Sequence, residues 1–125
     1  MLSKAKMVKA RKAVEMFYTG TCTVVEYQEV KKANKSTAFE EVVVLENQPC
    51  RLSYSTIDRT SGTDTGASSV VKITKLHISP DINVKAGSKI IVTQNNVTEV
   101  YKNSGEPAIY TTHQEIVLEH FERWS

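Results

Sequence analysis

The stretch KAGSKIIVTQNNVTEVYKNSGEPAIYTTHQEIVLE, residues 85 to 119, decides the fold, because it predicts a hairpin, a structured loop and a third strand. Two apolar runs, residues 90–93 and 97–101, flank the pair Asn95 and Asn96. Asparagine tolerates the positive φ values that a two-residue hairpin turn requires. A turn of this length also fixes which residues of the two strands face each other.

The predicted register leaves neither face of the hairpin cleanly polar. It pairs Gln94 with Val97, Val92 with Glu99, Ile91 with Val100 and Ile90 with Tyr101. One face carries Ile90, Val92, Val97 and Tyr101, and the other carries Ile91 and Val100. We therefore expect the first face to join the core and the second, with Ile91 and Val100, to contact another subunit.

Length and composition favour one soluble globular domain, residues 1–125. The chain has 125 residues, of which 40% are apolar and 24% are charged. The net charge of +2 is too small to favour nucleic-acid binding through bulk electrostatics. No apolar run approaches the roughly 20 residues of a membrane span, so we expect no membrane contact. Cys22 and Cys50 are too few for a disulfide framework, and we interpret them as reduced thiols of a cytoplasmic product.

The first residues, 3–18, predict a short amphipathic helix that ends at Gly20. The apolar positions recur at steps of three and four, as Met7, Ala10, Val14 and Phe17. Lys9, Arg11 and Lys12 lie between them and form either a solvated face or a docking surface for an acidic partner. The C-terminal twenty residues are acidic by contrast, and opposite charge at the two ends could set the polarity of an assembly.

The rest of the chain, residues 21–120, predicts about six or seven strands, most of them joined by turns rather than helices. The run Val42-Val43-Val44-Leu45 suggests burial on both faces, as in a barrel wall or a sheet covered by a subunit, and Pro49 is expected to interrupt that strand. Residues 116–124 fit either a strand or a helix, and we favour a strand with an irregular end. The predicted fold class is mainly β, a small antiparallel barrel or sandwich.

Residues 58–69, DRTSGTDTGASS, contain no large apolar side chain. Such a segment cannot bury enough surface to offset the entropy of ordering it. We therefore predict a long mobile loop, because a loop of this length in so small a domain is usually either functional or disordered.

The sequence offers little support for catalysis or for a bound cofactor. The histidines, His77, His113 and His120, show no metal-ligand spacing with each other or with the cysteines, so no metal site is predicted. No nucleophile motif and no phosphate-binding loop is present, so we predict that the protein is not an enzyme and binds no cofactor. A nucleic-acid-binding β-barrel stays open as an alternative, because Tyr27, Phe39, Tyr54 and Tyr101 could stack on bases, although aromatic residues at such positions are usually core.

Several motifs in the second half of the chain resemble a known family. They are VKAGSKI at residues 84–90, TQN at 93–95, SGEPAIY at 104–110 and THQEIVLE at 112–119, with a weaker match in PCRLSY at 49–54. In these segments the chain resembles the small head-closure, or head-tail connector, proteins of tailed bacteriophages and PBSX-type prophages, the XkdH/YqbH-like group.

The resemblance implies a non-enzymatic, mostly β subunit at the head-tail junction of a virion, made in the cytoplasm of the bacterial host. Copies of it would form a ring that meets the portal or adaptor, closes the DNA-filled head and attaches the tail. The resemblance also allows a contact with packaged DNA, and a tail-completion protein one layer lower is the alternative within the virion. The predicted interaction residues of the loop and of the family motifs are Asp58, Arg59, Asp64, Glu106 and His113.

Overall fold

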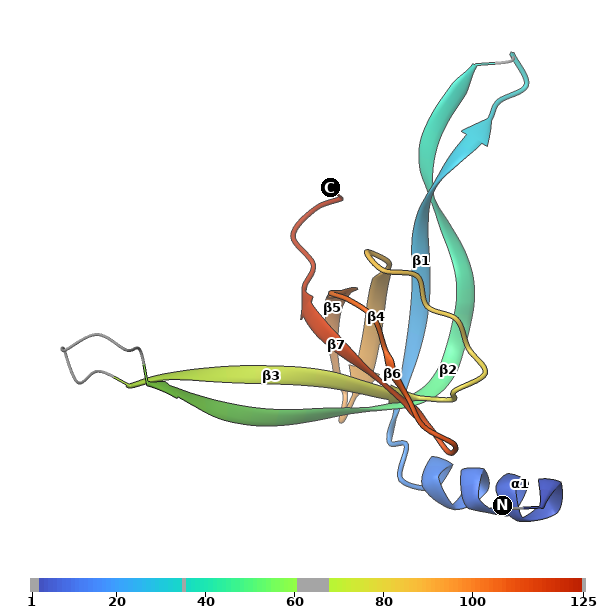
Figure 1. Cartoon of the computed structure of the whole chain (residues 1–125). Helices are drawn as coiled ribbons and strands as arrows, with labels where there is room; N and C mark the ends of the chain where they lie inside the picture. The colour runs from blue at the N-terminus through green and yellow to red at the C-terminus, as the bar shows by residue number, and fades with distance from the viewer. Residues whose placement is uncertain (1–2, 35, 61–67, 125) are drawn as a thin grey trace.

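The computed structural model describes residues 3–34, 36–60 and 68–124 (Figure 1). One helix, α1 (Lys4–Glu15), precedes seven strands, which are β1 (Gly20–Lys31), β2 (Thr37–Thr60), β3 (Ser68–Ile78), β4 (Lys89–Gln94), β5 (Val97–Asn103), β6 (Ala108–Ile109) and β7 (Gln114–His120). All strand pairings are antiparallel. The predicted mainly β fold with an N-terminal helix is therefore confirmed, as is a strand with an irregular end at residues 116–124.

The seven strands form one sheet that closes on itself. Their order is β3-β2-β1-β4-β5-β7-β6, and β3 also pairs with β7. That last pairing joins β3, at one end of the sheet, to β7 and so makes a ring of strands, with short β6 attached beside β7 (Figure 1). The contact between β3 and β7 is thus the closing seam of the fold.

The hairpin of β4 and β5 has the predicted register. Asn95 and Asn96 have φ values of 53° and 63°, and Ile90 pairs with Tyr101 while Ile91 pairs with Val100. Ile90, Val92 and Tyr101 are buried, as expected for the core face, but Val97 on the same face is exposed. Ile91 is half-buried and Val100 is exposed on the other face.

The core lies inside the ring, where every strand except short β6 contributes to it. Its residues are Cys22, Val24, Cys50, Leu52, Leu76, Ile78, Val84, Ile90, Val92, Tyr101, Ile116 and Leu118. Across the seam, Leu52 pairs with Leu76 and Leu76 with Ile116, so one buried row runs through β2, β3 and β7. This row is what holds the closing strands together, because apolar burial is the dominant favourable contribution to folding.

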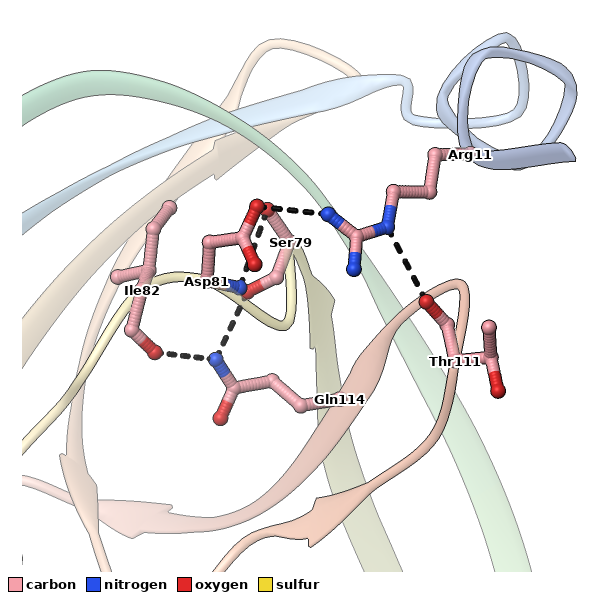
Figure 2. A network of polar contacts seen from close by, with 6 residues as sticks. All are labelled: Arg11, Ser79, Asp81, Ile82, Thr111 and Gln114. Carbon is pink, nitrogen blue, oxygen red and sulfur yellow. Dashed lines mark hydrogen bonds and ion pairs between the residues drawn. The ribbon is translucent and has the colours of Figure 1, made fainter. Parts of the chain in front are cut away.

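Two buried amides tie the long connection between β3 and β4 to the sheet. Asn103 Nδ2 donates to the carbonyl oxygens of Val84 and Lys85, at 3.0 and 3.2 Å. Gln114 Nε2 donates to the carbonyl oxygens of Ser79 and Ile82 (Figure 2). These bonds satisfy backbone groups of a segment that has no strand partner of its own.

Strand β2 corrects the prediction of two separate strands interrupted at Pro49. It runs unbroken over 24 residues, and it changes partner from β1 to β3 between Cys50 and Arg51. Asn47, with φ of 51°, and a register shift opposite residues 22–25 of β1 lie just before that change. A proline that lacks an N–H donor is tolerated at such a bulge, where the strand leaves one neighbour for another.

The ends of the predicted 58–69 loop are also corrected. Asp58, Arg59 and Thr60 continue β2, and they pair with Val70, Ser69 and Ser68 of β3. Backbone pairing does not require large apolar side chains, and Thr favours strands. The remaining residues, 61–67, lie outside the described part of the chain.

Two ribbons of paired strands extend beyond the ring (Figure 1). The first arm consists of residues 26–31 and 37–42, where β1 and β2 pair only with each other. The second arm consists of residues 55–60 and 68–73, where β2 and β3 do the same. The two arms point in different directions from the body (Figure 1).

Helix α1 is shorter than predicted and buries no residue completely. It ends at Glu15, and Phe17 is exposed beyond it. Gly20 opens β1 instead of ending the helix, and a Cβ there would lie 2.9 Å from the carbonyl oxygen of Thr93. The glycine therefore serves the close approach of β1 to β4.

Arg11 is the polar tether of the helix. Its Nη1 lies 2.7 Å from Asp81 Oδ2, and its Nε donates to the carbonyl oxygen of Thr111 at 3.1 Å (Figure 2). The helix is thus fixed to the β3–β4 connection and to the turn between β6 and β7.

Candidate functional site

A cluster of titratable side chains lies on the outer face of the closing seam. His77 on β3 and Glu115 on β7 are paired across the strands, and His113, just before β7, contacts both of them. The ligand-forming atoms of the three side chains all lie within 4.8 Å of one another, and each residue is half-buried. We call His77, His113 and Glu115 the seam cluster.

The seam cluster is held by specific contacts. His113 Nε2 lies 2.9 Å from Glu115 Oε2, and the imidazole rings of His77 and His113 are stacked with their centroids 5.5 Å apart. Ser53 Oγ lies 2.7 Å from His77 Nε2. Lys75 Nζ approaches Glu115 Oε1 at 3.5 Å.

These surroundings shift the pKa values of two members of the cluster. The hydrogen bond from His113 holds the pKa of Glu115 below its usual range, so the carboxylate is ionised at neutral pH. Burial, and then the nearby Arg51 guanidinium, lower the pKa of His77. His77 is therefore neutral at pH 7.

A cavity of about 390 Å³ lies beside the seam cluster. It is lined by Val14, Phe17, Tyr18, Arg51, His77, Thr112 and His113, so the end of α1 forms one wall and the sheet forms the other. Among the described residues the buried Tyr18 hydroxyl has no hydrogen-bond partner, and burial raises its pKa. The cavity thus offers both imidazoles and a phenol to a small group.

The predicted interaction residues fall into several places. Lys9 and Lys12 are exposed on α1, whereas Arg11 is committed to Asp81 and to Thr111 beside His113. Ile91 and Val100 form a separate pair on the outer face of β4 and β5, and Glu106 is exposed in the turn after β5. Asp58 and Arg59 lie in the second arm, and Asp64 lies outside the described residues.

The motifs that carry the family resemblance turn out to have structural roles. Both the backbone N–H and the hydroxyl of Ser104 donate to the carbonyl oxygen of Val117, and the Gly105 N–H donates to Asn103 Oδ1. Gln94 Oε1 accepts from the Leu52 N–H at 2.9 Å, which joins the hairpin turn to β2. The polar residues of these motifs therefore hold loops in place, a role that sequence patterns did not predict.

An aromatic ladder runs from the first arm to the C-terminal segment. Tyr27 stacks on Phe39 with a centroid distance of 5.5 Å and on Trp124 at 5.1 Å, and Phe121 meets Trp124 edge-on at 4.9 Å. Trp124 Nε1 donates to Glu41 Oε2, which also contacts Lys89. Phe39, at the outer end of the ladder, is 60% exposed.

The expectation that the strand aromatics belong to the core is wrong for most of them. Of Tyr27, Phe39, Tyr54 and Tyr101, only Tyr101 is buried, because the other three lie in or near the arms. Burial therefore removes Tyr101 from the set that could stack on bases. Tyr27 is already stacked within the chain, and Lys72 lies 4.3 Å above the Tyr54 ring.

The two cysteines are free thiols in the core, as predicted. The pKa of Cys50 is raised far above its usual range by its hydrogen bond with Cys22 and by burial. A thiol that stays protonated in an apolar site is a poor nucleophile. These cysteines are part of the packing.

In residues 3–34, 36–60 and 68–124, no helix has the length and apolarity needed to cross a membrane. The sequence matches no protein-family model and no curated protein. Among solved structures, the chain is similar to the phage-like element PBSX protein xkdH from Bacillus subtilis, with 13% sequence identity and a TM-score of 0.46 over 80% of this chain and 91% of that chain. A likeness of this size does not by itself assign the chain to a family.

Proposed function

We propose that this protein is a non-enzymatic structural subunit of the head-tail junction of a phage or prophage particle. Copies of the chain would form a ring that meets the portal or adaptor, closes the DNA-filled head and attaches the tail. The motifs described above, from VKAGSKI to THQEIVLE, support the family assignment. The two arms that extend beyond the ring of strands support assembly with other copies of the chain.

The observation that carries the proposal is the exposure of apolar side chains along the first arm and at its base. Val43 is 50% exposed, Val44 is 43% exposed, and Phe39 is exposed at the outer end of the aromatic ladder. A two-stranded ribbon without a covering layer is marginally stable in water. A neighbouring copy that covers the arm would bury these side chains and supply the missing layer.

A ring also requires that one patch of each copy meets a different patch on the next. The first arm and the Ile91–Val100 face of β4 and β5 are two distinct patches that are at least partly uncovered. We assign the first arm of one copy to the outer face of the β4–β5 hairpin of its neighbour. The exposed Lys9 and Lys12 would help to set the direction of assembly by contacting acidic groups on the next copy.

Particles made without the protein provide the main test. We expect heads that fill with DNA, leak it and lack tails when examined by electron microscopy. Normal tailed particles would overturn the proposal. Tails attached to leaking heads would instead favour a role one layer away from closure.

A single substitution tests the contact between copies. Val100→Glu places a charge in the proposed interface, so the isolated chain should fold normally while tail attachment is lost. Thr98→Glu, at an exposed position on the same strand face, tests how far the interface extends. If Val100→Glu collapses the thermal stability of the isolated chain, that face belongs to the core and the assignment fails.

A filter-binding series separates this function from a nucleic-acid-binding barrel. Phosphate-driven affinity falls steeply as salt rises. We expect the free chain to show no salt-dependent retention of DNA. Strong retention of DNA at low salt that disappears at high salt would favour a nucleic-acid-binding barrel.

A further inference from the structure

We propose that the seam cluster of His77, His113 and Glu115 is a binding site for a divalent transition-metal ion, with Zn²⁺ as the best-matched ion. The sheet register makes this site. His77 and Glu115 are directly opposed on β3 and β7, and His113, just before β7, stacks on His77 and contacts Glu115. His77 lies 36 positions before His113 and 38 positions before Glu115, so spacing along the chain does not reveal the cluster.

The distances fit a metal centre after small side-chain rotations. Ligand atoms at ~2.0–2.1 Å from a tetrahedral Zn²⁺ lie roughly 3.4 Å from one another. His113 Nε2 and Glu115 Oε2 are already 2.9 Å apart, and all three ligand atoms lie within 4.8 Å of one another. The side chains are half-buried, so none of the three is locked inside the core.

The donor set selects the kind of metal. Two imidazoles and one carboxylate match Zn²⁺ sites that keep a fourth position open. Ca²⁺ and Mg²⁺ prefer six or more oxygen ligands, which the seam cluster does not supply. The cavity lined by His77 and His113 lies where a water molecule or a small ligand group would complete the coordination.

Neighbouring hydroxyl groups can orient the two rings. Ser53 Oγ lies 2.7 Å from His77 Nε2, and Thr112 Oγ1 lies 3.3 Å from His113 Nδ1. Such outer contacts fix the tautomer and direction of a metal-binding imidazole. Lys75 and Arg51 bring positive charge close to the site, so we expect a weaker site than one with four protein ligands.

A metal ion here would join the two strands that close the ring. Binding to the folded state alone raises apparent stability in proportion to the logarithm of ligand excess. Zn²⁺ should therefore raise the unfolding temperature of the wild-type chain. This effect is a readout that does not depend on assembly or on the proposed function.

The experiment uses the full chain without a histidine tag, freed of metal by chelation and dialysis. Zn²⁺ is titrated by calorimetry, and Co²⁺ is added in a parallel sample to record its visible absorption. We expect one ion per chain, the intense bands of four-coordinate Co²⁺, and a higher unfolding temperature. His113→Gln and Glu115→Gln should each abolish these signals.

Two further variants test whether binding depends on the seam cluster itself. His120→Gln removes the histidine that stacks on Tyr101 outside the cluster, so it should bind Zn²⁺ as the wild type does. Ser53→Ala should weaken binding by roughly tenfold or more through loss of the ring contact. If His113→Gln does not fold, Glu115→Gln and Ser53→Ala give the answer. No binding by the wild type, or equal binding by wild type and His113→Gln, would overturn the site.

Discussion

Strand β4 of the body and strand β2 at the base of the first arm contain apolar runs of similar composition but different burial. In β4, Ile90 is fully buried, because β1 and β5 pair on either side and the ring encloses the inner face. In β2, Val43 and Val44 lie where the strand leaves the ring, and about half of each side chain stays exposed. Burial therefore depends on what covers a strand, and the run Val42-Val43-Val44-Leu45 predicts a covering that the single chain does not provide.

The largest difference between body and arm should appear on removing a core side chain at the seam. Leu76 is completely buried between Leu52 and Ile116. Leu76→Ala should lower the free energy of unfolding by about 2–5 kcal/mol, because it removes apolar contact and leaves a cavity. Urea denaturation followed by circular dichroism measures this loss. A loss below about 1 kcal/mol would mean that the ring is not closed at β3 and β7.

A smaller but clear loss should follow from removing a buried amide of the body. Asn103→Ala leaves the carbonyl oxygens of Val84 and Lys85 without their donor. Each unsatisfied buried group costs about 1–3 kcal/mol, so the unfolding midpoint in urea should fall with little change in slope. Glu106→Ala, at an exposed position in the turn that follows β5, is the matched control. Equal losses in the two variants would show that the buried amide has no special role.

The comparison also shows which features can be derived from the sequence. The β4–β5 register was predictable, because the turn residues Asn95 and Asn96 fix it locally. The seam cluster was not, because the pairing of His77 with Glu115 depends on ring closure between distant strands. The extent of the arms was missed for a related reason, since backbone pairing can continue past the core through polar residues such as Asp58 and Thr60.

Removing the Arg11 contacts of α1 should have an intermediate effect on stability, smaller than that of the core substitutions. Arg11→Ala removes the bonds to Asp81 and Thr111. Asp81 is largely exposed, so the ion pair contributes only about 0.2–1 kcal/mol. Hydrogen exchange should show faster exchange in α1 with little change in the strands. Lys12→Ala, at an exposed position of the same helix, should leave both unchanged, and equal exchange in the two variants would contradict the tether.

A substitution at the base of the first arm should have the smallest effect on the stability of the isolated chain and a large effect on assembly. Val43→Thr keeps the β-branched shape and removes apolar character from a side chain that is already half exposed. The free energy of unfolding of the monomer should change by no more than about 0.5 kcal/mol, as for other surface substitutions.

In an assembled ring the Val43 side chain would be buried against a neighbouring copy. Val43→Thr should therefore increase the fraction of free chain in sedimentation and reduce the number of tailed particles. The control is Thr56→Ser, an exposed position on the second arm, which should leave the first-arm contact intact. If Val43→Thr destabilises the monomer as much as Leu76→Ala does, the base of the first arm is packed within the chain itself. If it changes neither stability nor assembly, the apolar run on β2 is not an interface, and the contact between copies must lie elsewhere on the ring.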